Sequence, residues 1–297
     1  MRNRSISKRS GVSDIGSRYN QRGLESSEYR KNKIMIQNRI LYEDNDIIVC
    51  HKPAGIATQT ARIGQADMVS EITNYLVTAT KNKAASYGTR NKAGHTDDRS
   101  PYVGVVHRLD QPVEGVLVFA KTRHAAAELS KQNTENRMEK YYYAVVCGQE
   151  FEPDGVLTDY LLGDGKANTS RIVPPEVKGA KKAVLDYKIV EEQTYEETAL
   201  RIALARIRLH TGRHHQIRVQ MSHAGMSLLG DYKYADAETL KISDRMHIRE
   251  TALCAYRLSF FHPRTGRQMQ FKIRPEGRVF QSEHWKNFAE CTPHNGV

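Results

Sequence analysis

Residues 105–122 of this 297-residue chain read VVHRLDQPVEGVLVFAKT. Apolar runs flank the polar tetrapeptide at 107–110, and Pro112 and Gly115 punctuate the second run, so the pattern predicts two buried strands joined by a tight loop. A loop held between rigid strands is a candidate functional site. The tetrapeptide by itself does not show that the loop is functional, because an Arg-x-Asp in a loop is more often structural. Asp110 could pair with Arg108 or cap a turn.

The tetrapeptide His107-Arg108-Leu109-Asp110, followed by Pro, Gly, an apolar strand and Ala-Lys-Thr, resembles the signature of the RluA-type pseudouridine synthases. Four further segments match that family in order: KPAG at 52–55, KYYYAVVCG at 140–148, LHTGRHHQIRV at 209–219 and LLGD at 228–231. One such block would be a weak signal. Five blocks in family order over residues 41 to about 275 make the resemblance specific.

The resemblance implies a pseudouridine synthase fold. This is an α/β (α+β) domain with a mixed, largely antiparallel sheet flanked by helices and loops, and we expect it to span residues 37–291 as a single catalytic domain. The implied activity is isomerisation of uridines in ribosomal or transfer RNA. That reaction moves the base from an N1 to a C5 linkage with no net gain or loss of atoms or electrons, so it needs no cofactor.

The same resemblance assigns roles to individual residues. Asp110 matches the catalytic carboxylate, which must stay ionised beside the ribose as a nucleophile or base. Arg218 matches the cation that keeps it charged, and Tyr142 matches the aromatic residue that packs on the target base. Arg108 matches a residue that holds the RNA after the uridine leaves the helical stack. The other expected RNA contacts are His107, Arg213, His215 and Gln216.

The net charge of +11 indicates an anionic partner, but its distribution is uneven. Residues 1–36 carry nine Lys or Arg and three Asp or Glu, a net of +6, which leaves +5 for the other 261 residues. Because this segment has few large apolar side chains, we expect a disordered basic tail that either tethers RNA through phosphates or is a passive leader. Residues 292–297 are expected to form a short C-terminal tail.

Several other classes are disfavoured. No apolar run reaches the length of a membrane span and the N-terminus lacks a signal-peptide core, so we expect a cytoplasmic protein with no membrane association, acting as a monomer. The four cysteines have no C-x-x-C spacing and are expected to be reduced, mostly buried thiols. Residues 163–166 resemble a phosphate loop only superficially, since Tyr160 and Ala167 occupy two positions that the motif requires to be Gly and Ser or Thr.

The histidines of the 209–223 region do not form a metal motif, because no H-E-x-x-H or intervening carboxylate is present. We therefore expect no metal site from His210, His214, His215 and His223. A kinase is disfavoured because Leu109 interrupts the His-Arg-Asp triplet and the other kinase motifs are absent. A non-catalytic RNA-binding protein on the same fold stays as the alternative, although it would have no reason to place Asp110 against phosphates.

Local patterns predict most of the elements. The expected strands are a hairpin near 40–50, a strand at 141–147, two or three short strands within 155–191, a strand at 200–209 with a bulge or bend near Ala205 and Arg206, and a hairpin of 252–261 with 268–274. The expected helices are 67–80 capped by Asp67, 122–137 capped by Thr122, one through 217–224 that stops at Gly225, and 281–289. A mobile loop is expected at 81–101.

Overall fold

A computed structural model describes residues 36–62, 64–86, 100–195, 199–281 and 285, without the side chains of 81–86. Most of the expected N-terminal tail, the expected C-terminal tail and nearly all of the expected helix at 281–289 lie outside these ranges, so the tail and domain boundaries stay predictions. The described chain begins at Ile36, which is buried. Among the described residues, no helix combines the length and apolarity needed to cross a membrane.

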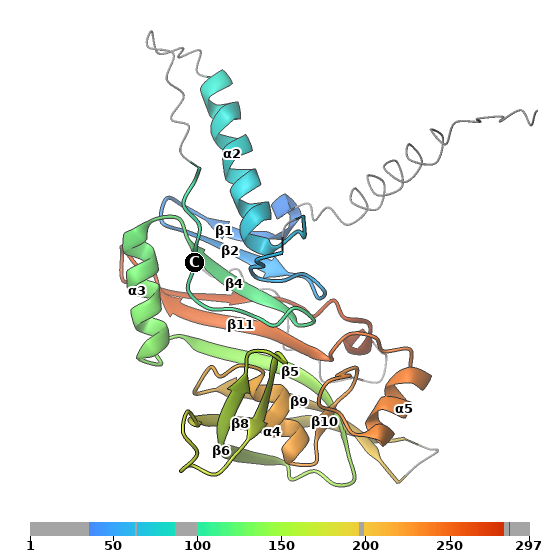
Figure 1. Cartoon of the computed structure of the whole chain (residues 1–297). Helices are drawn as coiled ribbons and strands as arrows, with labels where there is room; N and C mark the ends of the chain where they lie inside the picture. The colour runs from blue at the N-terminus through green and yellow to red at the C-terminus, as the bar shows by residue number, and fades with distance from the viewer. Residues whose placement is uncertain (1–35, 63, 87–99, 196–198, 282–284, 286–297) are drawn as a thin grey trace, which may run out of the picture. The chain divides into compact units, whose positions relative to one another are not determined.

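A twelve-stranded sheet forms the framework, with the main order β1-β2-β4-β11-β5-β9-β8-β6-β7 (Figure 1). Of the pairs described, only β4 with β11 is parallel, which confirms the expected mixed, largely antiparallel sheet. The strands are β1 (Ile40–Glu43), β2 (Ile47–Lys52), β3 (Gly104–Val105), β4 (Glu114–Ala120), β5 (Glu139–Gly148), β6 (Asp154–Asp164), β7 (Thr169–Ile172), β8 (Lys181–Thr194), β9 (Arg201–Leu209), β10 (Ser227–Leu228), β11 (Leu253–Phe261) and β12 (Gln268–Lys272).

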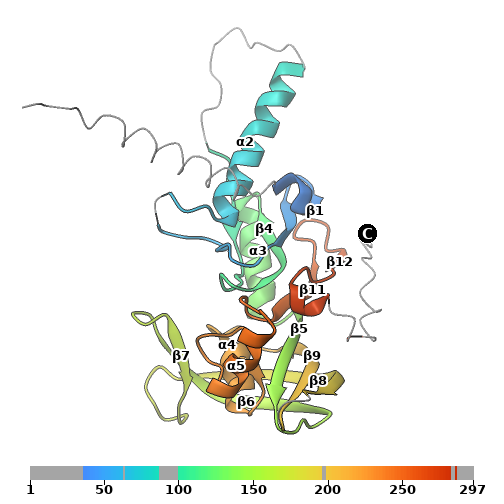
Figure 2. The ribbon, with the colours of Figure 1, turned by 90° about the vertical axis from the view of Figure 1, so that its right-hand side faces the viewer.

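The helices are α2 (Met68–Ser86), α3 (Arg123–Thr134), α4 (Gln216–His223) and α5 (Ala237–Arg245), with 3-10 turns η1 (Ile36–Arg39) and η2 (Arg278–Phe280). In both views α2 lies at the β1–β2 end of the sheet, whereas α4 and α5 lie with the half that contains β6 to β9 (Figures 1 and 2). The loop before β4 and the turn before α4 therefore come from different halves of the sheet.

The capping predictions hold at both expected helix starts. Asp67 Oδ1 accepts a hydrogen bond from Ser70 N at 2.7 Å, and Thr122 Oγ1 accepts one from Ala125 N at 3.1 Å. Helix α4 is followed by Gly225 at φ +76°, as expected of a helix stop. The described cysteines Cys50, Cys147 and Cys254 are buried and reduced, as predicted.

One local prediction was wrong and a second was right only in part. Helix α2 continues through residues 81–86, which we expected to open a loop; the segment KNKAAS is rich in Lys and Ala and contains no Gly or Pro to end a helix. The second prediction, a bulge or bend near Ala205 and Arg206, was right in position but wrong about the strand: the register shifts opposite Ala205 and Leu204, and the extra residue lies in β8, between Ile189 and Glu191. Because Ile202 to Ala205 are buried on both faces of β9, the apolar phase change there reflects two-sided burial rather than an extra residue.

The expected strands at 155–191 are longer than predicted, because β6 and β8 pair along most of their lengths. The glycine-rich segment at 163–166 belongs to the turn between β6 and β7, where Asp164 Oδ1 accepts hydrogen bonds from Lys166 N and Ala167 N at 2.9 and 3.0 Å. It is a hairpin turn stabilised by an Asp side chain. This structure agrees with the prediction that the segment is not a phosphate loop. Helix α5, capped by Asp236, was not predicted.

Candidate active site

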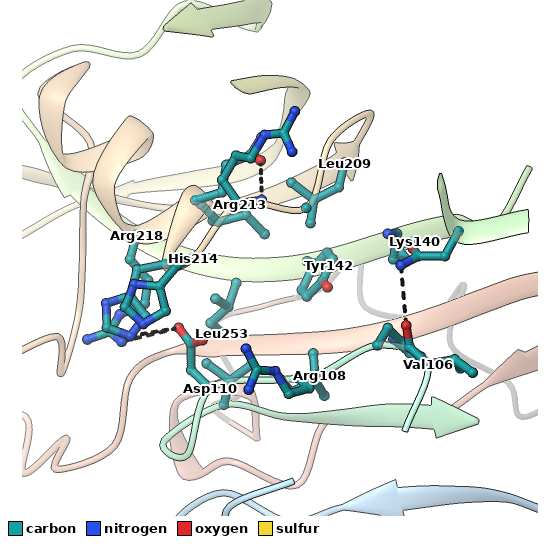
Figure 3. Close-up of a pocket in the computed structure, with 18 of the residues that line it drawn as sticks. Val106, Arg108, Asp110, Lys140, Tyr142, Leu209, Arg213, His214, Arg218 and Leu253 are labelled. Atoms are coloured by element: carbon teal, nitrogen blue, oxygen red, sulfur yellow. Dashed lines mark hydrogen bonds and ion pairs between the residues drawn. The ribbon is translucent and has the colours of Figure 1, made fainter. Parts of the chain in front are cut away.

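A pocket of about 490 Å³ lies where the loop before β4, the strand β5 and the turn between β9 and α4 meet (Figure 3). It brings together all eight residues that the resemblance placed in the site, from three chain segments: His107, Arg108, Asp110, Tyr142, Arg213, His215, Gln216 and Arg218. These residues are up to 111 positions apart in the sequence. Their convergence therefore depends on the sheet.

The Asp110 loop is held by the segment that follows β2. Lys52 is fully buried, and its Nζ donates to the carbonyl oxygens of Pro53, Ile56 and Gln111 at 3.0, 2.6 and 3.1 Å. Thr58 Oγ1 accepts from Leu109 N at 3.1 Å and is 3.0 Å from Leu109 O. The residues before and after Asp110 are thus both tied to one short segment, which restricts the backbone that carries its carboxylate.

Arg218 joins two carboxylates. Its Nε and Nη2 donate to Asp231 at 2.7 and 2.6 Å, and its Nη1 donates to Asp110 Oδ2 at 3.3 Å. Asp231 is 1% exposed, so the forked pair fixes the guanidinium plane and leaves one nitrogen for Asp110. Burial by itself would lower the pKa of Arg218, but the bonds to Asp231 and the charge of Asp110 outweigh it and raise that pKa. The cation beside Asp110 is permanent.

Tyr142 lies on β5 with its side chain in the pocket, between Arg218 and Lys140 in the view of Figure 3. It is 6% exposed, and burial, followed by the charge of Asp110, raises the pKa of its hydroxyl. The hydroxyl is therefore protonated at neutral pH and able to donate. Lys140, two residues earlier and on the same strand face, donates to Asn133 Oδ1 at 2.8 Å, and burial lowers its pKa.

Gln216 shapes the turn before α4. Its Oε1 accepts from Thr211 Oγ1 and Arg213 N at 2.8 and 2.9 Å, and its Nε2 donates to Val184 O at 3.1 Å. With its amide engaged on both sides and the residue 3% exposed, Gln216 braces the turn. Arg213 is exposed and donates through Nε to Lys182 O at 2.9 Å.

The two basic residues of the 107–110 tetrapeptide differ in environment. His107 Nε2 accepts from Val118 N at 3.2 Å, and burial followed by the charge of Lys140 lowers the pKa of His107 to about 3. Its ring is thus neutral and engaged with β4. Arg108 is exposed at the pocket and, within the described part of the chain, no hydrogen bond or ion pair involves its guanidinium. RNA contact by either residue remains a prediction.

The histidines that raised the metal question have separate partners. His210 pairs with Asp186, His223 Nδ1 lies 3.6 Å from Asp159, and His214 Nδ1 is 3.0 Å from Ser170 Oγ. Elsewhere among the described residues, two groups bring three possible ligands together: Asp44, Asp46 and His262, and His51, Glu114 and Glu276. In each group an arginine already binds a carboxylate: Arg264 pairs with Asp46 and Arg39 with Glu276. Neither group lines the pocket.

Sequence reasoning missed two residues of this site. Asp231 was quoted as part of a matching block but given no role, and Tyr234 was not singled out. Tyr234 lies with its hydroxyl 2.6 Å from His215 Nδ1 and its ring 5.1 Å from the Arg218 guanidinium carbon. No periodicity or spacing signals either contact. An Asp after an apolar Leu-Leu-Gly turn was the only available hint for Asp231.

Comparison with known proteins gives a consistent result. The profile of the RNA pseudouridylate synthase family matches residues 46–223. The Dual-specificity RNA pseudouridine synthase RluA of Salmonella typhi is 32% identical over 234 residues, which cover 79% of this chain and 91% of that protein. The Ribosomal large subunit pseudouridine synthase D of Zymomonas mobilis is 32% identical over 235 residues, covering 78% of this chain and 67% of that protein.

A third relative, the Uncharacterized RNA pseudouridine synthase YhcT of Bacillus subtilis, is 31% identical over 226 residues. That match covers 76% of this chain and 65% of that protein, so the chain spans just under two thirds of its length. Among solved structures, Human RNA Pseudouridylate Synthase Domain Containing 4 is similar with a TM-score of 0.60 and 21% identity, covering 88% of this chain and 95% of that one. This similarity shows a shared fold.

Proposed function

The chain belongs to the RNA pseudouridylate synthase family, and we propose that it is an isomerase that converts uridines of RNA to pseudouridine with Asp110 as the catalytic carboxylate. The observation that carries the assignment is the Asp110–Arg218–Asp231 arrangement at the pocket. Asp110 has a side chain 25% exposed, so a substrate can reach it, while its partner Arg218 is 5% exposed and fixed from behind. An ionised, accessible carboxylate is what the reaction requires.

The geometry supports a division of roles. Pseudouridine formation breaks the bond between N1 and C1′ of the nucleotide, turns the base, and joins C5 to C1′. The hydrogen on C5 then leaves as a proton and N1 gains one, so the product is an isomer of the substrate. The Asp110 carboxylate serves either as the nucleophile at the sugar or as the base that removes a sugar proton. Tyr142 offers a ring face to the base and a protonated hydroxyl. Arg108, at the exposed side of the pocket, is placed to bind the RNA that remains after the uridine is turned out of its stack.

We further propose ribosomal or transfer RNA as the substrate, in keeping with one relative named for the ribosomal large subunit and another named as dual-specific. RNA contacts by His107, Arg213, His215 and Gln216 and a monomeric protein acting in the cytoplasm are part of the same proposal. The target uridine is found by mapping pseudouridines in cellular RNA with and without this gene. Its segment then serves as the substrate in vitro.

Asp110→Asn is expected to keep the fold and RNA affinity but to lose turnover, because the amide has the same shape and no charge. Tritium release from RNA that carries [5-³H]uridine measures turnover, and filter binding measures affinity. Asp154→Asn is the matched control, since Asp154 is an exposed residue at the start of β6 and is not among the residues that line the pocket. Turnover by Asp110→Asn at the level of the control would show that another group performs the chemistry.

A further inference from the structure

Tyr234 contacts both groups that flank Asp110. Its hydroxyl oxygen lies 2.6 Å from His215 Nδ1, and its ring lies under the Arg218 guanidinium at 5.1 Å. On the other side of His215, the Nε2 atom lies 3.7 Å from Asp110 Oδ2. A chain of contacts therefore runs from Tyr234 through the imidazole ring to the carboxylate, parallel to the one that runs from Asp231 through Arg218.

The hydrogen bonds around Tyr234 restrict where its proton can point. Ser170 N donates to the Tyr234 hydroxyl oxygen at 2.9 Å, so this oxygen already serves as an acceptor. The remaining O–H has one described acceptor within reach, His215 Nδ1. If the hydroxyl donates to Nδ1, the hydrogen of a neutral His215 must be on Nε2, the nitrogen that faces Asp110.

The opposite tautomer carries two penalties. With the hydrogen on Nδ1, the Tyr234 oxygen would receive two donors and its own proton would lose the imidazole acceptor. The Nε2 lone pair would then face the Asp110 carboxylate, which is a repulsion between two acceptors. With the hydrogen on Nε2, both contacts are attractive. The contacts at Nδ1 and at Nε2 therefore favour the same tautomer, the one with its hydrogen on Nε2.

The backbone of His215 is held in an uncommon conformation. Its φ of 55° and ψ of 25° lie in the left-handed region at the start of α4, which few residues other than glycine adopt, and its side chain makes no capping bond. The ring is stacked on His214 at 3.7 Å between centroids, and His214 in turn contacts Ser170 Oγ. A strained backbone conformation of this kind persists only where the surrounding contacts hold the residue in it. Here those contacts direct the imidazole edge toward Asp110.

We propose that Tyr234 is a positioning residue, which fixes His215 as the neutral tautomer with its hydrogen on Nε2 and so directs a neutral N–H donor at the Asp110 carboxylate. This proposal rests on the proposed role of Asp110. The separation of 3.7 Å is longer than a full hydrogen bond, as is common at catalytic contacts before substrate closes the site. Asp110 would thus have a cation on one side and an uncharged donor on the other.

Burial, more than the charges around it, keeps the His215 ring neutral. Burial, opposed by the charge of Asp110 and reinforced by Arg218, His214 and Lys233, lowers the pKa of His215 to about 4. At neutral pH the ring therefore orients the carboxylate without adding a second cation. A second cation would hold the carboxylate charge more tightly and make Asp110 a weaker nucleophile or base.

The tautomer can be measured without any RNA. In protein labelled with ¹⁵N-histidine, long-range ¹H–¹⁵N correlation spectra distinguish the two neutral tautomers and the imidazolium. We expect His215 at pH 7 to carry its hydrogen on Nε2, and this form to lose dominance in Tyr234→Phe. Tyr232→Phe, an exposed tyrosine two residues away whose hydroxyl bonds Asp244, is the matched control and should leave the His215 signals unchanged. A hydrogen on Nδ1 or an imidazolium in the wild type would overturn the proposal.

Kinetics test the consequence for Asp110. His215→Gln keeps an N–H near the position of Nε2, whereas His215→Leu removes it. The single-turnover rate of the Gln variant should therefore be close to that of the wild type, and the rate of the Leu variant should be much lower. Tyr234→Phe should lower that rate about tenfold with RNA affinity unchanged, as expected for weakening one hydrogen bond to a charged group. Equal rates for Gln and Leu, or a Tyr234→Phe defect confined to affinity, would overturn the proposal.

These outcomes separate this inference from the proposed function. If Asp110→Asn were fully active, the catalytic assignment would fail while the NMR result would still report the tautomer. If Asp110→Asn were inactive and His215 had its hydrogen on Nδ1, the function would stand and the role of Tyr234 would be refuted.

Discussion

Arg218 and Lys52 illustrate two ways in which a buried cation can serve the site. Arg218 is compensated by a full ion pair with Asp231 and keeps its charge. Lys52 donates to three carbonyl oxygens, and burial, opposed by the charges of Asp110 and Glu114, lowers its pKa to about 7. The first holds a charge beside Asp110, and the second holds the loop that carries it.

The lowered pKa of Lys52 predicts a pH-dependent stability. In the unfolded chain the amine of Lys52 has a pKa of about 10.4, so between pH 7 and 10 the unfolded state binds more protons than the native state. Stability from this group therefore rises with pH across that window and is flat below it. The difference in unfolding free energy between wild type and Lys52→Met should increase from pH 7 to 10, measured by urea unfolding. Lys131→Met, at an exposed lysine of α3, should show a pH-independent difference.

At the scale of elements, the site depends on close contacts at strand ends. Gly230 follows β10 and precedes Asp231, with φ +68°, and a Cβ there would meet the carbonyl oxygen of Glu250 and come within 2.8 Å of its carbon. Gly266 in the β11–β12 hairpin has the same φ of +68°, but a Cβ there would meet nothing within 4 Å. The two glycines share a backbone conformation and differ in the space around them.

This pair gives a matched prediction. Gly266→Ala should cost about 1 to 2 kcal/mol, the strain of a left-handed residue with a side chain. Gly230→Ala should cost roughly 1 to 3 kcal/mol more, because the backbone of Glu250 must also shift. It should lower turnover as well, since Asp231 follows directly. Urea unfolding measures the two losses of stability, and tritium release measures the loss of turnover. Equal losses of stability in Gly230→Ala and Gly266→Ala would mean that the close approach to Glu250 is easily relieved.

At the scale of the whole molecule, charge is concentrated at the N-terminus while the pocket carries its own cations. Residues 1–36 hold nine Lys or Arg, and the described lining of the pocket includes the cations Arg108, Lys140, Arg213 and Arg218. Non-specific attraction to phosphates scales with the number of cations that contact RNA, whereas catalysis depends on the placement of a few groups. Affinity and rate should therefore respond differently to loss of this segment.

Deleting residues 1–35 is expected to weaken RNA binding and flatten its salt dependence, while the single-turnover rate at saturating RNA is retained. Each lost phosphate contact should reduce the slope of log affinity against log salt by roughly 0.7 to 0.9. A full-length variant with the nine basic residues replaced by Gln separates charge from length and should match the deletion. An unchanged slope would make the segment a passive leader, and a collapsed rate would place part of it in the site.

The sequence alone determined the local elements and the identity of the site segments. Caps such as Asp67 and Thr122, the glycine stop after α4 and the alternation of apolar residues are short-range signals, and they located most helices and strands. The matching blocks predicted Asp110, Tyr142 and Arg218 as the catalytic set. Where local signals misled, as at β9, the reason was burial on both faces, which depends on neighbours that the local sequence does not reveal.

Only the tertiary structure decided how those residues act together. The parallel pairing of β4 with β11, the fork of Asp231 on Arg218, and the contacts of Tyr234 with His215 and Ser170 join residues from separate segments. Such contacts depend on which strands become neighbours and on the exact direction of each side chain, and no local propensity encodes either. The orientation of the groups around Asp110 is therefore a property of the assembled sheet.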